Sequence, residues 1–189
     1  MLTEISLNVI DIARNSVRAG ADLIEIAVII DSSTSALTLR ISDNGKGMTP
    51  EQVNSVEDPF FTSRKTRSVG LGIPFLKQEA ECTGGSFHIS SVLGKGTVVE
   101  ATFMQDHIDC MPLGDINSSI FTLVTTSDDV DYIYRYEVDE RGFTLDTREI
   151  REIMQGVSLQ NAQVSSFIKS FLDENKQEAD EGSVNGGIK

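Results

Sequence analysis

The first twenty residues place apolar side chains at spacings of three and four, the period of a helix with one buried face. We expect a helix over residues 2–19 that ends near Gly20, because glycine readily adopts the left-handed conformation that closes a helix. Two polar residues, Asp11 and Asn15, are four apart and therefore share a face one turn from each other. The apolar stripe consists of Ile5, Val9, Ile12, Ala13 and Val17.

Dense apolar runs bounded by polar turns predict four β-strands in the first hundred residues. Residues 23–30 and 36–41 form one pair, and residues 86–91 and 97–103 form another. The turn between the second pair is Leu93-Gly-Lys-Gly96. The apolar density of the first pair indicates that at least one face lies under helices.

Two helix starts lie between these pairs of strands. Thr49 suits the N-cap of a helix and Pro50 its first position. A second helix over residues 72–82 is closed by Gly84-Gly85. Residues 56–69 lack clean periodicity, which predicts a mobile loop. The loop is basic, because it contains Arg64, Lys65 and Arg67.

The C-terminal half predicts a hairpin followed by two helices. Residues 120–126 and 132–138 read as strands on either side of Ser127-Asp-Asp. Asp146 can cap a short helix over residues 147–154.

A second helix in this half starts at Ser158 or Asn161. Its apolar positions recur at helical spacing, which is typical of a core contact and also suits the docking of a partner. From residue 175 onward the sequence is polar and rich in glycine, so we expect residues 175–189 to be disordered. The stripe consists of Val164, Phe167, Ile168, Phe171 and Leu172.

Charge excludes several classes of function. The chain of 189 residues has 29 acidic and 16 basic residues, a net charge of −13, which argues against binding to nucleic acid or to an anionic membrane surface. The excess is in the C-terminal half: residues 1–105 carry 12 acids and 9 bases, and residues 106–189 carry 17 acids and 7 bases.

Two cysteines without CxxC spacing indicate free thiols rather than a zinc site. With neither a membrane-span run nor a signal peptide, we expect a cytoplasmic protein.

One polar stretch, Ser42-Asp43-Asn44-Gly45-Lys46-Gly47-Met48, follows the second strand. Taken alone it is a common turn signal, because Asn and Gly tolerate the positive φ of a tight hairpin. Asp11 and Asn15, taken alone, are equally typical of a solvated helix face. Downstream, however, stand Asp58-Pro-Phe-Phe-Thr62-Ser-Arg-Lys65 and Ser68-Val-Gly70-Leu-Gly72-Ile. The order of the four motifs is more specific than any one of them.

Together these motifs resemble the four ATP-site motifs of the GHKL superfamily. That superfamily includes histidine-kinase ATPase domains, gyrase, the ninety-kilodalton heat-shock chaperones and MutL-type repair proteins. The resemblance covers about residues 1–104 and implies an α+β fold. This fold is a two-layer α/β sandwich of the Bergerat type, with a mixed sheet, helices on one face and the nucleotide between. We expect three parts: an ATP-binding domain (1–104), a small acidic C-terminal domain containing a β-hairpin and helices (105–174), and the disordered tail (175–189).

The resemblance also implies ATP and Mg²⁺ as cofactors. Asp43 matches the residue that accepts the adenine amine, and Thr97 matches the one that assists it. Asn15 matches the single protein ligand of the metal ion. Gly70 and Gly72 open a helix whose free N–H groups favour phosphate, whereas Lys65 suits either a lid over the phosphates or a merely solvated loop. The residues expected to bind nucleotide are Asn15, Asp43, Gly45, Gly47, Met48, Thr62, Lys65, Gly70, Leu71, Gly72 and Thr97.

Asp11 is the expected catalytic residue. Hydrolysing members have a longer Glu at this position, so nucleotide binding is better supported than hydrolysis. Neither His88 nor His107 lies on a helical hairpin before the motif helix, so a phosphoacceptor would belong to another protein. Two functions remain open, a protein kinase acting in trans and an ATP-gated binding module with weak or no hydrolysis. The region 105–173 is similar to stand-alone ATPase proteins found near iron hydrogenase genes, which implies a protein partner related to hydrogenase or redox chemistry. The sequence is also compatible with a dimer of this protein.

Overall fold

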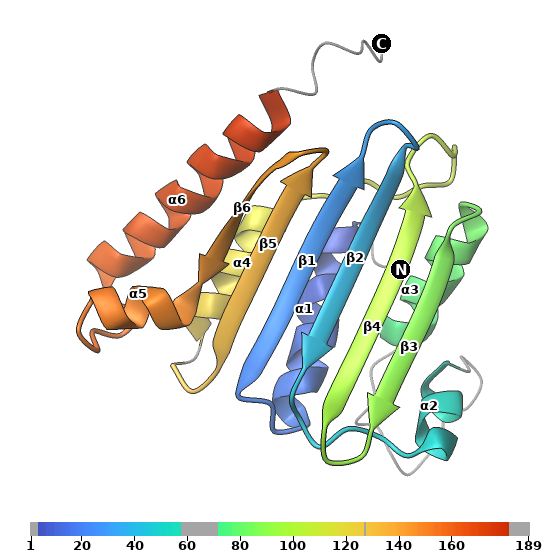
Figure 1. Ribbon diagram of the computed structural model, residues 1–189, viewed down its shortest axis with the longest axis horizontal. Helices are drawn as coiled ribbons and strands as arrows, with labels where there is room; N and C mark the ends of the chain where they lie inside the picture. Colours follow the sequence, from blue (N-terminus) through green and yellow to red (C-terminus); the bar gives the residue numbers. More distant parts are fainter. Residues whose placement is uncertain (1–3, 58–71, 127, 182–189) are drawn as a thin grey trace.

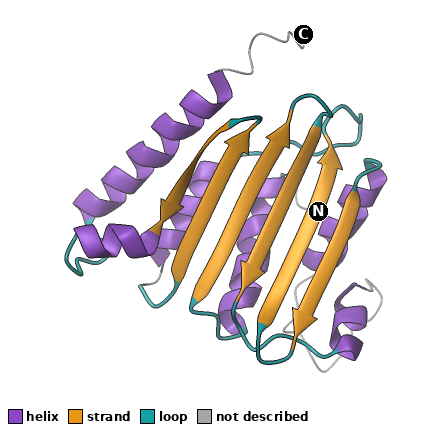
Figure 2. Ribbon diagram, in the orientation of Figure 1, coloured by secondary structure: helices purple, strands orange, loops and turns teal. Residues whose placement is uncertain are grey.

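The computed structural model describes residues 4–57, 72–126 and 128–181 (Figure 1). These residues fold into a twisted sheet and a layer of helices; Figure 2 shows several helices behind the sheet and a long one along its side. None of the helices within these ranges has the length and apolar character needed to cross a bilayer.

The described strands form one six-stranded sheet in the order β3-β4-β2-β1-β5-β6. Only the β1–β5 pair among them is parallel, so the sheet is mixed. The strands are β1 (Leu23–Asp31), β2 (Ala36–Asp43), β3 (Ser86–Val92), β4 (Gly96–Met104), β5 (Asp131–Val138) and β6 (Arg141–Asp146).

The helices cover one face of this sheet. Contacts join α3 to α1, α1 to α4 and α4 to α6, so the helices follow the sheet from one edge to the other. The helices are α1 (Ile5–Arg18), α2 (Pro50–Glu57), α3 (Gly72–Cys82), α4 (Ile116–Thr126), α5 (Thr147–Ile153) and α6 (Ala162–Glu181). The predicted α+β fold with two layers is confirmed.

Alternation along the strands explains why only one face is covered. Ile24, Ile26 and Val28 of β1 are buried, whereas Glu25 between them is exposed. Successive side chains of a strand point to opposite faces, so the buried set faces the helices. Arg40 of β2 is also exposed, on the open face of the sheet. The pattern therefore fixes which side chains can line a site between the layers.

The predicted strand over residues 120–126 is wrong, because this segment belongs to α4. Its β-branched and aromatic residues favour a strand by composition. The buried positions Ile116, Ile120 and Leu123 recur at helical spacing, and this period is visible only when the segment is extended backward. Asp115 begins the helix by accepting the backbone N–H of Ser118 at 2.9 Å. The hairpin in this half consists of β5 and β6 instead.

The predicted disorder from residue 175 is wrong as far as Glu181, because α6 continues to that residue. Pairs four residues apart support this part of the helix: Lys176 with Asp180 at 2.5 Å and Gln177 with Glu181 at 2.6 Å. Tyr136 of β5 also donates its hydroxyl to Asp180 at 2.7 Å and ties the helix to the sheet. The remainder of the predicted tail, residues 182–189, lies outside the described residues.

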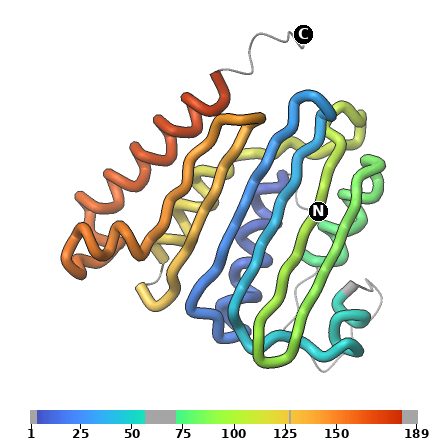
Figure 3. Tube along the Cα trace, in the orientation of Figure 1, coloured from blue at the N-terminus to red at the C-terminus, as the bar shows by residue number. Residues whose placement is uncertain are grey.

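The C-terminal half joins the sheet of the N-terminal half. β5 pairs with β1 along eight positions, from Leu23 opposite Asp131 to Ile30 opposite Val138. Figure 3 shows this neighbourhood as the orange segment beside the blue one. The boundary at residue 104 stays a prediction, and the hydrogen-bonded sheet extends across it.

Candidate nucleotide-binding site

Asp43 ends β2 on the helix-covered face of the sheet, two residues after buried Ile41. One carboxylate oxygen accepts the hydroxyl of Ser16 in α1 at 2.7 Å, and the other accepts the backbone N–H of Gly45 at 2.9 Å. Each carboxylate oxygen has a second lone pair, so Asp43 can still accept from a ligand. Thr97 of β4 stands directly opposite Asp43 in the ladder. The two residues predicted to recognise adenine therefore lie together.

The loop after β2 is fastened to the end of α1 and the start of β1. The side-chain oxygen of Asn44 accepts the backbone N–H groups of Asp22 and Leu23, each at 3.1 Å. The N–H of Lys46 donates to the carbonyl of Ala19 at 3.0 Å. These bonds hold the loop in one place before any ligand arrives, which reduces the ordering cost of binding.

Two glycines allow the β3–β4 hairpin to close over this loop. Gly47 has φ of +63° and Gly96 has φ of +114°, conformations that side chains rarely adopt. A Cβ on Gly47 would overlap the carbonyl group of Val92, and a Cβ on Gly96 would overlap that of Asp43. Close backbone approach is thus the structural role of Gly47, alongside its predicted role near the base.

Ser91 of β3 is a site residue that the sequence did not reveal. Its hydroxyl lies 2.8 Å from the N–H of Met48, 2.9 Å from the carbonyl of Gly96 and 2.9 Å from the hydroxyl of Thr97. A carbonyl can only accept, so the single Ser91 proton goes to Gly96 and Thr97 donates to Ser91. The hydroxyl of Thr97 has then spent its proton, so toward a ligand it can only accept. The available signal was the position of Ser91 two residues after the apolar Ile89, which puts both side chains on the same face of the strand.

Asp11 and Asn15 lie on α1 where this helix faces the start of α3. A Cβ on Gly72, the first residue of α3, would overlap the carboxylate of Asp11. Glycine at position 72 therefore gives Asp11 room beside the N-terminus of α3, where partial positive charge favours anions. The structure thus brings together Asp11 and Gly72, one residue from the first motif and one from the last.

The side chain of Asn15 is incompletely bonded. Its Nδ2 is buried without a partner among the described residues, and its Oδ1 accepts only a long bond of 3.4 Å from Arg18. A buried polar group without a partner is costly. Turning the amide by 180° would put the oxygen in the buried position, which is the atom that a metal ion takes. The side chain fits the expected ligand.

A second polar contact joins α1 and α3 one turn before Asp11. Asn8 is fully buried and donates to the carboxylate of Glu79 at 3.2 Å. Its Oδ1 has no partner among the described residues. Burial raises the pKa of Glu79 above its ordinary value, and the hydrogen bond from Asn8 opposes this shift. The sequence analysis missed this pair, because Asn8 falls within an apolar stripe.

The phosphate end of the predicted site is described only in part. Thr62, Lys65, Gly70 and Leu71 lie outside the described residues, and so does most of the predicted basic lid over residues 56–69. The roles of these residues stay predictions. The other predicted site residues are described, and the contacts join them in two groups: Asp11 with Gly72, and Asp43 with Gly45 and Thr97. The described site residues are Asp11, Asn15, Asp43, Gly45, Gly47, Met48, Gly72 and Thr97.

A mixed sheet backed by helices, with a held carboxylate at a strand end facing the first helix, defines an ATP-binding module of the GHKL type. The chain belongs to the family described as histidine kinase-, DNA gyrase B- and HSP90-like ATPases, whose model matches residues 1–107. The resemblance expected from the four motifs is thereby confirmed.

Relatives in the family include sensor histidine kinases. The chain is 32% identical over 98 residues to sensor histidine kinase ZraS of Salmonella typhi, covering 51% of this chain and 20% of that protein. It is 35% identical over 101 residues to sensor protein SrrB of Staphylococcus aureus (strain NCTC 8325 / PS 47), covering 51% and 17%. The chain thus spans a fifth or less of the length of these relatives.

A solved structure shares the fold. The N-terminal domain of a DNA repair protein superposes with a TM-score of 0.51 and 13% identity, covering 77% of this chain and 52% of that one. At this identity the likeness supports the fold alone.

Proposed function

We propose that this protein binds Mg-ATP between α1, α3 and the sheet and acts as a protein kinase on a separate partner protein. The observation that carries the nucleotide assignment is the carboxylate of Asp43, which is held by Ser16 and Gly45 and faces Thr97. The side chains of Asp43 and Thr97 therefore present hydrogen-bond acceptors next to each other. The exocyclic amine of adenine is a donor, whereas guanine has a carbonyl at that position.

When bound, ATP supplies a transferable γ-phosphoryl group. The chain's own residues bind and orient it: Asn15 is the expected oxygen ligand of Mg²⁺, which takes few protein atoms. Asp11 lies beside the start of α3, and in this proposal its carboxylate orients an attacking group or holds its proton. The N–H groups of the first turn of α3 favour phosphate oxygens.

The positions of the two histidines argue against either of them as the phosphoacceptor. His88 precedes Ile89 in β3 and therefore points to the open face, away from Asp43 and Thr97. His107 follows β4, whose far end is seven residues from Thr97, or roughly 23 Å at about 3.3 Å per residue.

The alternative function is an ATP-gated binding module with weak or no hydrolysis. It is favoured by the short side chain at position 11, since family members that hydrolyse ATP have glutamate there. A misplacement of about 1 Å can cost on the order of 100-fold in rate. In this function, nucleotide binding alone changes the surface offered to a partner.

The nucleotide assignment is tested by calorimetry with Mg-ATP and Mg-GTP. We expect Mg-ATP to bind more tightly, and Asp43→Asn to lose about 1.5–3 kcal/mol of ATP affinity because a donor then faces the amine. Asp31→Asn, at the far end of β1, is the matched control. Equal affinities for the two nucleotides would remove the assignment.

The metal assignment is tested with Asn15→Ala in buffers containing Mg²⁺ or EDTA. We expect the affinity loss to appear mainly with Mg²⁺, because the partner of Asn15 is the metal ion. The same loss in both buffers would make Asn15 a structural residue.

Single-turnover assays on the wild type, Asp11→Glu and Asp11→Ala distinguish the protein kinase from the ATP-gated binding module. For the kinase we expect little hydrolysis by any of the three, with labelled phosphate on a co-purified partner for the wild type only. For the ATP-gated binding module we expect no labelled partner and no effect of Asp11→Ala on nucleotide-dependent partner binding. Fast hydrolysis by the wild type that both variants abolish contradicts both functions and makes Asp11 the working base of an ATPase.

A further inference from the structure

The start of α1 is capped by residues 112 and 113, which lie in the segment between β4 and α4. The N–H of Ile5 donates to the carbonyl of Pro112 at 3.1 Å. The next N–H, that of Ser6, donates to the carbonyl of Leu113 at 2.9 Å. The first N–H groups of a helix have no partner within the helix, and a capping side chain often accepts them. Glu4 stands at the N-cap, and its side chain makes no capping bond. Two backbone carbonyls therefore replace the side-chain cap.

Gly114 brings this segment against the N-cap of α1. Its φ of +75° is a conformation that side chains rarely adopt, and a Cβ on Gly114 would overlap the side chain of Glu4. The overlap includes the Cβ of Glu4, at 2.7 Å, whose position is set by the backbone. Rotation of the Glu4 side chain cannot relieve this overlap, so alanine at position 114 requires one of the two backbones to move.

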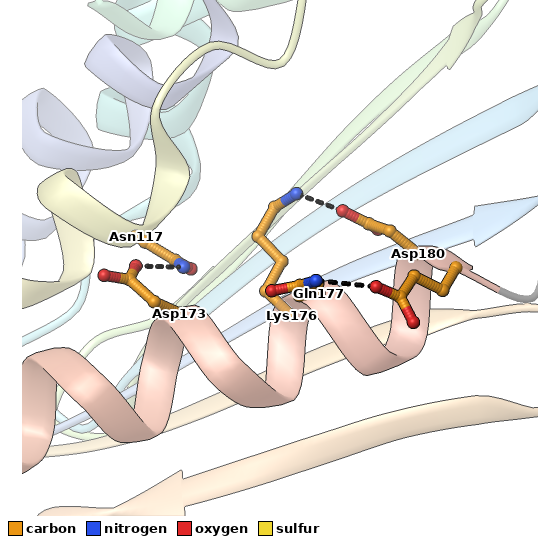
Figure 4. Close-up of a pocket in the computed structure, with 6 residues that line it drawn as sticks. Asn117, Asp173, Lys176, Gln177 and Asp180 are labelled. Atoms are coloured by element: carbon orange, nitrogen blue, oxygen red, sulfur yellow. Dashed lines mark hydrogen bonds and ion pairs between the residues drawn. The ribbon is translucent and has the colours of Figure 1, made fainter.

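The backbone that follows Gly114 is held in place by α4 and α6. Asp115 begins α4 by accepting the N–H and the hydroxyl of Ser118 at 2.9 and 2.6 Å. Asn117 of α4 is buried and donates to the carboxylate of Asp173 at 2.9 Å. Figure 4 shows the amide of Asn117 beside this carboxylate of α6. The start of α4 is thus fastened to α6, so we expect the start of α1 to yield.

The other end of α1 is fixed at the nucleotide site, where Ser16 donates to Asp43 at 2.7 Å. At about 1.5 Å per residue, Ile5 lies about 16.5 Å before Ser16 along the helix, and Asp11 lies about 7.5 Å before it. A tilt of α1 about Ser16 that moves Ile5 by about 1 Å therefore moves Asp11 by roughly 0.5 Å. Asn15, beside the pivot, hardly moves.

Asp11 has no spare room for such a shift. A Cβ on Gly72 would overlap its carboxylate, so α1 and the start of α3 are in close contact there. In the proposed function, the start of α3 binds the phosphates, whereas Asp43 and Thr97 recognise adenine. A tilt of α1 should therefore disturb the phosphate end of the site and leave the recognition of adenine unchanged.

We propose that Gly114 is a positioning residue of the nucleotide site. Because it has no side chain, residues 112 and 113 reach the first N–H groups of α1, and this contact sets the tilt of α1 and the placement of Asp11 against α3. The segment between β4 and α4 thereby links the C-terminal half of the chain to phosphate binding in the N-terminal half. This role of Gly114 rests on the nucleotide binding proposed above.

The test compares Gly114→Ala with Gly156→Ala by calorimetry with Mg-ATP and Mg-ADP. Gly156 has a φ of +83°, and a Cβ there would meet no atom of the described residues within 4 Å, so this control carries the same backbone strain without the overlap. We expect Gly114→Ala to weaken Mg-ATP binding by about fivefold or more, since coupling between sites is typically about 5–150-fold. The loss for Mg-ADP should be smaller, because the γ-phosphate is the group expected beside Asp11. Gly156→Ala should bind both nucleotides like the wild type.

The double variant Glu4→Gly/Gly114→Ala tests the cause of this loss. It removes the side chain that the new Cβ would meet and places glycine at an N-cap, where glycine is tolerated. It should therefore recover most of the Mg-ATP affinity. A second pair, Gly114→Asn and Gly156→Asn, keeps the overlap at position 114 with less backbone strain, because asparagine tolerates positive φ. This pair replaces the alanine pair if circular dichroism shows that Gly114→Ala is unfolded.

Hydrogen exchange without nucleotide provides a second measurement. Exchange in the first turn of α1 should be faster in Gly114→Ala than in Gly156→Ala. The proposal is overturned if Gly114→Ala binds Mg-ATP like the wild type, if Gly156→Ala loses as much affinity, or if the double variant stays as weak as Gly114→Ala. A wild type that binds no adenine nucleotide would contradict the proposed function instead. Equal exchange in the two variants would then overturn the positioning of α1 by Gly114 as well, and faster exchange in Gly114→Ala would support it.

Discussion

Individual side chains in the candidate nucleotide-binding site are held by neighbours that no motif marks. Asp43 and Thr97 were predicted from the motif order, and the structure places them opposite each other. Their supports, Ser16 and Ser91, were not predicted. Serine is common on exposed strands and helices, so its residue type alone carries no signal. Only the fold brings these hydroxyls within bonding distance.

Ser91→Ala should weaken ATP binding by about five- to tenfold, since a net hydrogen bond contributes about 1 kcal/mol. The variant frees Thr97 to rotate and leaves the N–H of Met48 without its acceptor. Ser90→Ala is the matched control, because Ser90 is exposed on the opposite face of β3. Calorimetry with Mg-ATP measures both. Similar affinities for the two variants would show that Ser91 does not position Thr97.

At the scale of elements, the site depends on how the β3–β4 hairpin meets the loop after β2. The sequence predicted both segments, and the Gly-Lys-Gly corner was recognised as a turn. The contact between them was not predictable, because it joins residues about fifty positions apart. Gly94 and Gly96 illustrate the difference: both have positive φ, yet only Gly96 lies against Asp43.

Gly96→Ala should therefore destabilise the protein more than Gly94→Ala. Both substitutions place alanine at positive φ, which costs about 1–2 kcal/mol. Around Gly94 a Cβ would meet open space, whereas at Gly96 it would overlap the backbone of Asp43. We expect an additional loss of about 2 kcal/mol or more in the free energy of unfolding, measured with urea. Equal losses of stability in Gly96→Ala and Gly94→Ala would contradict the close contact between Gly96 and the backbone of Asp43.

The contact between α1 and α3 makes stability depend on pH. The pKa of Glu79 is raised in the folded state by burial, so folding favours the protonated carboxyl. The resulting stabilisation is present at pH values below the pKa of Glu79 in the unfolded chain, 4.5. It is lost as the pH rises through the higher pKa of Glu79 in the folded protein. Glu79→Gln should remove this dependence and stabilise the protein at pH 7. A glutamine can both accept from Asn8 and donate to the Asn8 Oδ1, which has no partner among the described residues.

We expect a gain of up to about 1 kcal/mol for Glu79→Gln at pH 7, measured by urea unfolding at pH 5 and pH 7. Glu81→Gln, at an exposed position of the same helix, is the control. A loss of stability at pH 7, or an unchanged pH dependence, would contradict the role assigned to the Asn8–Glu79 pair.

Across the whole molecule, one sheet joins the two halves of the chain. The parallel β1–β5 pair and the α1–α4 contact both cross the predicted boundary at residue 104. The chain has no tryptophan, and its three tyrosines are Tyr132, Tyr134 and Tyr136 of β5. Tyrosine fluorescence therefore reports on the C-terminal half alone, whereas circular dichroism reports on all helices.

Urea unfolding should give the same midpoint by both signals, because the two halves share a sheet and a helical layer. Mg-ATP should raise both midpoints together, since a ligand of the folded state stabilises every part that unfolds with its site. Separate midpoints, with only the dichroism transition shifted by ATP, would indicate two independent units and support the division at residue 104.

The sequence by itself determined the helix and strand periods of the first hundred residues, the order of the four motifs and thus the family. These are local properties, because side-chain periodicity and turn chemistry are set by neighbouring residues. Tertiary structure decided the identity of α4, the extent of α6 and the addition of β5 and β6 to the sheet. In each case, burial against a distant segment or a bond such as Tyr136–Asp180 outweighed local composition.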